Sequence, residues 1–210
     1  GADGASFPLE PPAPAAGLPR DGFAPGRGLY VPPPEHGSDL PLAIAPGSAR
    51  LAPLAPWPAW DGRDFTALQV LLKAVGKCTT DHISPAGPWL RYRGHLTNIC
   101  QNLFIGANNC FDLDGSGQGI DVRDHSVKPL PDLARAYKEA GIDWVAVGDE
   151  NYGEGSSREH AAMEPRYMGG RAIIVRSFAR IHEANLKKQG VLAPTFRNPD
   201  DYERILVDDT

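Results

Sequence analysis

The chain of 210 residues is 41% hydrophobic and 22% charged, which suits one domain with a well-buried core and an appended segment. A formal net charge of −5 and an isoelectric point near 5.7 give no general attraction to nucleic acid or anionic lipid, although they allow a local basic pocket. No apolar run approaches the roughly 18 residues that cross a bilayer. We therefore expect a soluble protein that is not bound to a membrane.

The two ends of the sequence indicate a longer parent protein. The chain begins with Gly1 rather than Met, and it stops at Thr210 just after the apolar run 205–207. We expect a fragment or a processed chain with a truncated C-terminus, so any targeting peptide would lie outside it.

Residues 1–62 hold 14 of the 21 prolines. Proline removes a backbone donor and does not fit a helix interior, so this segment is expected to be extended. It is either a free interdomain linker or an arm that drapes over a neighbouring domain. We favour the arm, because free linkers seldom carry aromatic residues. The aromatic residues of this segment are Phe7, Phe23, Tyr30, Trp57 and Trp60.

Residues 63–210 are expected to form an α/β domain, because short apolar runs alternate with helical patterns. The expected strands are apolar runs at residues 67–75, 144–147, 172–175 and 191–196, with a further short apolar run at 103–107. The expected helices cover residues 131–140, a segment from Ser156 or Ser157 to just before Pro165, and a segment from an N-cap at Ser177 to Gly190. Gly141 is expected to cap the first of these helices in a left-handed conformation.

Residues 112–124 form a polar, glycine-rich segment that we expect to be a surface loop. Its opening, from Asp112 to Gly117, resembles part of a calcium-binding loop. The twelfth position carries Arg123 in place of the bidentate glutamate, so a plain loop is the better interpretation.

The three cysteines, Cys78, Cys100 and Cys110, lack the C-x-x-C spacing that metal and cluster sites use. We expect free thiols, which favours a reducing compartment. The alternatives are a metal site completed by another chain and a regulatory thiol.

Residues 148–158 follow an expected strand and open an expected helix. Glycines let the backbone approach a ligand, while free N–H groups and the helix dipole attract an anion. Ser156 and Ser157 add hydroxyls, and Arg158 adds a planar fork that suits a carboxylate. The alternative is a plain helix cap with Arg158 in solvent. Because arginine in a first turn opposes the helix dipole, a bound carboxylate would explain its presence better.

A second polar group, residues 77–84, follows the first expected strand and leads to residues 91–95. Asp81 and His82 are adjacent, and adjacent side chains of an extended segment point to opposite faces. We expect Asp81 to support an arginine or a serine hydroxyl, rather than His82 to transfer a proton directly. Arg93 is either a surface ion-pair residue or part of the site.

Two blocks of the sequence, together with its opening arm, resemble one family. GKCTTDHISPAGPWLRYRGHLTN (76–98), GDENYGEGSSREHAAMEPRYMGGRAIIVRSFARIHEANLKKQG (148–190) and the Glu10-Pro11-Pro12 arm are similar to the C-terminal portion of mitochondrial-type aconitases. The resemblance covers nearly the whole chain. It departs from the family at about residues 108–128, outside the candidate site.

The resemblance implies a three-layer β/β/α swivelling domain, hinged to three upstream domains that hold a [4Fe–4S] cluster. In the family, the serine that matches Ser156 is the base that takes a proton from the substrate. The residues that match Ser157, Arg158 and Arg93 bind its carboxylates, and the match to Asp81 is a supporting carboxylate. This chain retains all five identities.

The resemblance also implies a biological setting. The expected activity is that of an aconitate hydratase, which interconverts citrate and isocitrate through cis-aconitate in the tricarboxylic acid cycle. The cluster ligands would lie outside this chain, so we expect the chain alone to be inactive. The full-length enzyme is expected to be a monomer in the mitochondrial matrix, or in the cytoplasm if the source is bacterial.

Two alternatives remain. A small subunit of an isopropylmalate isomerase or a homoaconitase uses a similar swivel domain, but the proline-rich arm and residues 148–159 favour a fused aconitase. A non-catalytic module that binds nucleic acid is the other alternative, and the acidic net charge is evidence against it.

Overall fold

The computed structural model describes residues 30–111 and 115–210, and only some residues between positions 4 and 28. It contains two compact units, Gly1–Ala43 and Ile44–Thr210. The first unit has neither helix nor strand among its described residues, where Phe23 and Tyr30 are exposed; Phe7 lies outside those residues. All elements below belong to the second unit.

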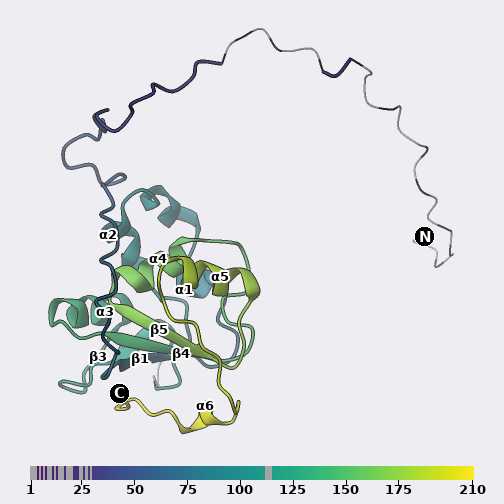
Figure 1. Cartoon of the computed structure of the whole chain (residues 1–210). Helices are drawn as coiled ribbons and strands as arrows, with labels where there is room; N and C mark the ends of the chain where they lie inside the picture. Colours follow the sequence, from purple (N-terminus) through teal and green to yellow (C-terminus); the bar gives the residue numbers. More distant parts are fainter. Residues whose placement is uncertain are drawn as a thin grey trace. The chain divides into compact units, whose positions relative to one another are not determined.

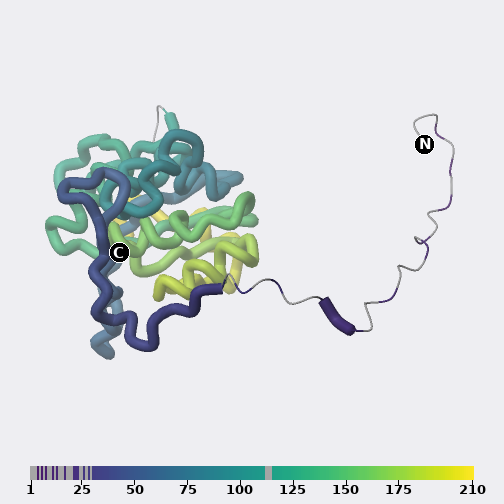
Figure 2. Tube along the Cα trace, turned by 90° about the horizontal axis from the view of Figure 1, so that it is seen from above, coloured from purple at the N-terminus to yellow at the C-terminus, as the bar shows by residue number. Residues whose placement is uncertain are grey.

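Residues 44–68, here called the strap, run along the outside of the second unit toward its first strand (Figures 1 and 2). The Ala52 N–H donates to the Gly94 carbonyl over 2.8 Å, and Trp57 Nε1 donates to Gln189 Oε1 over 2.9 Å. The Trp57 ring also packs against the core. The proline-rich sequence is thus tied to its own domain at these points, while the boundary at residue 62 and contact with a neighbouring domain remain predictions.

Three parallel strands form the central sheet, in the order β1 (Gln69–Lys73), β4 (Trp144–Gly148) and β5 (Gly170–Val175). All five residues of β1 and all five of β4 are buried, as expected for a parallel sheet covered on both faces. The α/β class and the strands predicted near residues 67–75, 144–147 and 172–175 are confirmed. The predicted strand at 191–196 is only partly right. The segment is not a regular strand, but it lies beside β5, joined by two isolated parallel bridges and four backbone hydrogen bonds.

Three longer helices accompany the sheet: α3 (Leu130–Glu139), α4 (His160–Tyr167) and α5 (Arg180–Lys188). Helices α4 and α5 contact each other, α4 packs on β5, and α3 contacts β1 (Figure 1). The prediction of α3 is confirmed, and Gly141 follows it with a φ of 70°. Among the described residues no helix is long and apolar enough to cross a membrane.

The remaining elements are short. They are the helices α1 (Thr80–Ile83), α2 (Leu96–Ile99) and α6 (Asp201–Arg204), the 3-10 helices η1 (Gly87–Tyr92) and η2 (Cys100–Asn102), and the strands β2 (Gln118–Ile120) and β3 (Val127–Pro129). The apolar run 103–107 lies mainly in turns. Its residues Leu103, Phe104 and Ala107 belong to the hydrophobic core, although the run lies outside the sheet.

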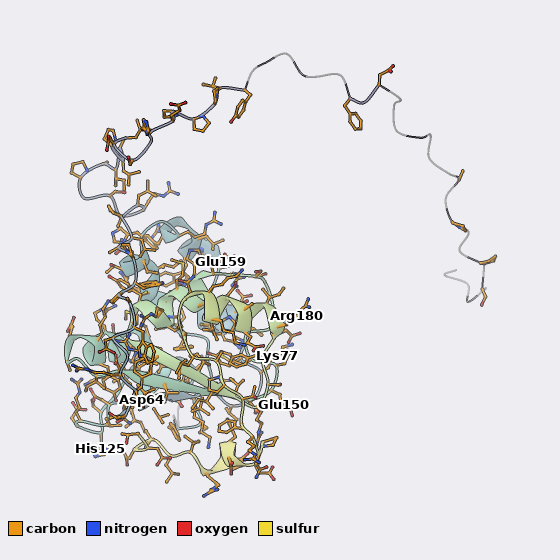
Figure 3. All side chains as sticks on the ribbon, in the orientation of Figure 1. Asp64, Lys77, His125, Glu150, Glu159 and Arg180 are labelled. Carbon is orange, nitrogen blue, oxygen red and sulfur yellow. The ribbon has the colours of Figure 1, made fainter. Side chains whose placement is uncertain are left out.

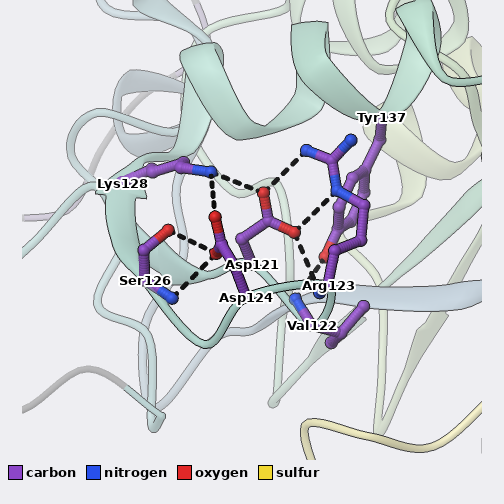
Figure 4. A network of polar contacts seen from close by, with 7 residues as sticks. All are labelled: Asp121, Val122, Arg123, Asp124, Ser126, Lys128 and Tyr137. Atoms are coloured by element: carbon purple, nitrogen blue, oxygen red, sulfur yellow. Dashed lines mark hydrogen bonds and ion pairs between the residues drawn. The ribbon is translucent and has the colours of Figure 1, made fainter.

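The predicted surface loop at 112–124 is only partly right. Residues 118–120 form β2, which pairs with β3 in an antiparallel hairpin, and residues 112–114 lie outside the described part. At the hairpin turn the buried Asp121 carboxylate accepts from Arg123 Nε over 2.8 Å and from Lys128 Nζ over 2.7 Å (Figure 4). The hydrogen bonds from Arg123 are the main reason that the pKa of Asp121 lies below its usual range. This acidic residue therefore holds the turn together.

Two predicted helix starts are wrong. Helix α4 begins at His160 rather than at Ser156 or Ser157, and it contains Pro165 instead of ending before it. Helix α5 begins at Arg180 after the N-cap Ala179, which has no side-chain cap bond. Ser177 instead accepts a hydrogen bond from the Asn151 backbone N–H over 2.8 Å, so it stabilises the loop after β4.

Candidate functional site

The two polar segments singled out in the sequence lie side by side in the structure. Residues 76–84 follow β1 and residues 149–159 follow β4, and the carboxyl ends of neighbouring parallel strands meet at one edge of the sheet. The Gly153 N–H donates to the Cys78 carbonyl over 2.7 Å, and the Thr80 N–H donates to the Glu154 carbonyl over 2.9 Å. The labels of Lys77, Glu150 and Glu159 locate the two loops in Figure 3. Loops far apart in sequence thus form one candidate site.

An ion pair between Arg158 and Asp81 joins the loops. Arg158 Nη1 lies 2.6 Å from Asp81 Oδ1, and the same nitrogen donates to the Ser84 carbonyl over 3.1 Å. The Arg158 side chain is only 15% exposed, whereas that of Asp81 is 59% exposed. The hydrogen bond from Arg158 lowers the pKa of Asp81 below its usual range. Asp81 is therefore ionised at neutral pH and orients the guanidinium.

These contacts leave one edge of Arg158 available. A guanidinium has five N–H donors in a fixed plane, and the two on Nη1 are used by Asp81 and Ser84. Nε and Nη2 form no hydrogen bond within the part of the chain that the structure describes. Such an edge can donate two parallel hydrogen bonds to a carboxylate.

Ser156 and Ser157 lie in the irregular segment before α4, and both are exposed. Neither hydroxyl forms a hydrogen bond with another residue that the structure describes. The expected support from a helix N-terminus is therefore absent at these serines, because α4 begins only at His160. Gly155, with a φ of +117°, lets this segment pass close to Thr80: a Cβ on it would lie 3.0 Å from Thr80 Oγ1.

Arg93 is linked to the same region through its main chain. Its carbonyl lies 3.2 Å from Nε2 of His160, the first residue of α4. Its side chain lines a cavity of about 730 Å³, together with Arg166 and with strap residues such as Trp57. The structure thus places Arg93 near the start of α4, but it shows no polar contact between its guanidinium and Arg158 among the described residues.

His82 has a structural position. Its side chain and that of Thr79 form a capping box at α1, in which the Thr79 N–H donates to His82 Nδ1 over 3.2 Å. The same Nδ1 lies 3.0 Å from the Lys77 carbonyl, so in either tautomer this ring nitrogen has a backbone partner.

Two buried residues of the site were not singled out by sequence reasoning. Glu164 on α4 is 0% exposed, and its Oε1 accepts from Ser84 Oγ over 2.7 Å. His182 on α5 is 2% exposed, and burial lowers its pKa to about 4. The Gly153 turn sits against the His182 ring so closely that a Cβ there would collide with it. The only signal for Glu164 in the sequence was that this charged residue stands among otherwise apolar residues at 161–165.

Two of the three cysteines of this chain do not suit an iron–sulfur cluster. Cys78 and Cys100 are buried, and burial raises the pKa of Cys78 to about 12 and that of Cys100 well above its usual range. Cluster ligands are thiolates, which these environments disfavour. No three His, Cys, Asp or Glu side chains converge as a metal site within the described ranges.

Comparison with known proteins places these loops in a family. The sequence profile of the aconitase C-terminal domain matches residues 68–199. Proteins named aconitate hydratase, mitochondrial, are 56% identical over 208 residues in Gracilaria gracilis and 53% identical over 207 residues in Saccharomyces cerevisiae. These alignments cover 98% and 99% of this chain but 26% of each relative, so the chain spans about a quarter of their length.

A solved structure titled 3-isopropylmalate dehydratase, from Methanocaldococcus jannaschii, also aligns with this chain. The sequence identity is 26%, the coverage is 54% of this chain and 53% of the other, and the TM-score is 0.35. A likeness of this size supports no functional conclusion.

Proposed function

Since this chain belongs to the aconitase C-terminal domain family, we propose that it is the part of an aconitate hydratase that binds the carboxylates of citrate and isocitrate and supplies the base. The observation that carries the proposal is the arrangement of Arg158, which Asp81 and the Ser84 carbonyl hold by one nitrogen while its other edge has no partner among described residues. Relatives over nearly the whole chain bear the name aconitate hydratase, mitochondrial, which supports this choice of substrates.

Binding a tricarboxylate requires several cations or donors that point to one place. The Nε–Nη2 edge of Arg158 would accept one carboxylate in a bidentate pair. Ser157 adds a hydroxyl next to it, and Arg93 would bind a second carboxylate once the substrate and the other domains complete the site.

Ser156 is proposed as the base. Its Oγ would take the proton from a substrate carbon that bears a carboxylate, and the electron pair of that C–H bond would form the double bond of cis-aconitate as the hydroxyl on the adjacent carbon departs. A serine hydroxyl is a weak base unless positive charge and donors stabilise its alkoxide, and Arg158 two residues later supplies such charge. Groups outside this chain would assist departure of the hydroxyl.

The rest of the enzyme belongs to the proposal. Because the two buried cysteines do not suit a cluster and Cys110 is a single further thiol, the [4Fe–4S] group of the family would be held by the upstream domains 1–3, with this domain swivelling against them. We expect this chain alone to be inactive and the full-length enzyme to be a monomer in the mitochondrial matrix. No observation favours the alternative of a nucleic-acid-binding module.

The test compares two neighbouring serines in the full-length enzyme. Ser156→Ala should lower kcat by at least about a thousandfold with a small change in KM, because it removes a group that acts on the reacting carbon. Ser157→Ala should mainly raise KM. Steady-state rates with citrate and with cis-aconitate measure both effects, and a Ser156→Ala enzyme with near-normal kcat would refute the role of Ser156.

A further inference from the structure

Glu164 is a buried acid that the proposed reaction does not use. It lies on α4 with 0% exposure, and the single hydrogen bond of its carboxyl among described residues comes from Ser84 Oγ, 2.7 Å from Oε1. Its Oε2 is buried without a partner in that same part of the chain, and no ion pair involves it. Burying a carboxyl in this way is costly, so its retention in the core requires a physical reason.

Ser84, the partner of Glu164, is fixed at three points. Its N–H donates to the Thr80 carbonyl over 2.9 Å, its hydroxyl donates to Glu164, and its carbonyl accepts from Arg158. It is 2% exposed and caps the C-terminus of α1. The Ser84 carbonyl therefore has a defined position, and one of the two contacts that orient Arg158 depends on it.

We propose that Glu164 is a positioning residue for the carboxylate-binding arginine: through Ser84 it fixes the carbonyl that holds Arg158 Nη1, and so it directs the Nε–Nη2 edge toward the substrate. This inference rests on the proposed function, since it assigns a purpose to the orientation of Arg158. Glu164 does not touch the substrate or the reacting atoms.

The protonation state of Glu164 follows from its surroundings. Burial raises its pKa well above the usual range of a glutamate, and the hydrogen bond from Ser84 opposes this only in part. No cation among the residues that the structure describes pairs with this carboxyl, so burial favours its neutral form. The Ser84 hydroxyl then needs only an acceptor oxygen at that position.

This requirement can be tested with an isosteric pair of variants. Glu164→Gln keeps a carbonyl oxygen for Ser84, whereas Glu164→Leu has a similar volume and no acceptor. In the full-length enzyme we expect KM for citrate within about twofold of wild type in Glu164→Gln and about tenfold higher in Glu164→Leu, with kcat changed less than KM. If the site instead needs a charged carboxylate at position 164, KM should rise in Glu164→Gln as well.

Ser84→Ala removes the other partner of the hydrogen bond between Ser84 and Glu164. It is the smaller structural change, so it replaces Glu164→Leu as the test if that variant fails to fold. It should raise KM by a similar factor. Where both single variants fold, the double variant Glu164→Leu, Ser84→Ala should raise KM no further than either one, because the two act through one connection. Leu133→Ala on α3 is the control for lost core stability: it should lower Tm and leave KM unchanged.

The outcomes separate this inference from the proposed function. If KM is unchanged in Ser84→Ala, the positioning role is overturned, whether or not Glu164→Leu folds. A Glu164→Leu enzyme that loses only Tm, as Leu133→Ala does, overturns it as well. If Ser156→Ala keeps its turnover, the proposed function fails, whatever the Glu164 variants do.

Discussion

Replacing Arg158 with lysine tests the geometry of the proposed site while keeping its charge. Arg158 Nη1 is held by Asp81 at 2.6 Å and by the Ser84 carbonyl at 3.1 Å, which leaves a planar edge for a bidentate carboxylate. A lysine ammonium is a point charge on a flexible stem, and the exposed Asp81 carboxylate would attract it away from the substrate. Losing one charge-assisted hydrogen bond costs roughly 1.5–3 kcal/mol. That corresponds to a rise in KM of about 10- to 150-fold.

The assay is steady-state turnover of the full-length enzyme with citrate, isocitrate and cis-aconitate. Because the lost bond holds substrate and transition state alike, KM should rise more than kcat falls. Arg135→Lys is the matched control, since Arg135 lies on α3 in an exposed ion pair with Asp132. An Arg158→Lys enzyme whose KM stays within twofold of wild type would show that this guanidinium does not bind a substrate carboxylate.

Three further predictions concern the domain itself. Asp121→Asn should lower the free energy of unfolding at pH 7. Because the folded pKa of Asp121 is depressed, the stabilisation by its carboxylate is present above about pH 4 and is lost as the pH falls through the folded pKa. Urea titrations of both proteins across that pH range measure this loss. His182 has a folded pKa of about 4, so as the pH falls it is protonated in the unfolded state before it is protonated in the folded state. The free energy of unfolding should therefore fall by roughly 3 kcal/mol between pH 6.5 and pH 4, and this fall should be smaller in His182→Asn. Among the thiols, the exposed Cys110 should react with a disulfide reagent in the native state, and the two buried thiols should react only after unfolding; fast labelling of all three would contradict their burial.

The sheet could be predicted because its strands are continuous apolar runs. Strands β1 and β4 are buried along their whole length, so their sequences lack polar alternation and stand out. Helix α3 is marked by Pro131 at its start and Gly141 after its end. The run 191–196 is equally apolar in part and forms backbone hydrogen bonds with β5, yet its pairing is interrupted into two isolated bridges. The residue types of this run do not determine how far its backbone pairing with β5 continues, so the sequence alone could not exclude a regular strand there.

The site was predictable as two polar loops, but not as one connected group. Asp81 and Arg158 are 77 positions apart, and only the parallel neighbours β1 and β4 bring them within 2.6 Å. The start of α4 was misplaced because Ser-Ser before a helical pattern is a typical N-cap signal. The Gly153 and Glu154 backbone instead bonds with Cys78 and Thr80, and the chain stays irregular through the serines until α4 begins at His160.

That correction changes which groups can make Ser156 a base. A helix dipole acts within its first turn, and α4 begins four residues after Ser156, so the dipole contributes little at its Oγ. The hydroxyl is exposed and has no partner among described residues, so in this domain alone its acidity should be that of an ordinary serine in water. Stabilisation of an alkoxide must then come from Arg158 and from donors that water no longer screens. Ser156 is therefore expected to act as a base only after substrate and the neighbouring domains close over the loop and exclude solvent.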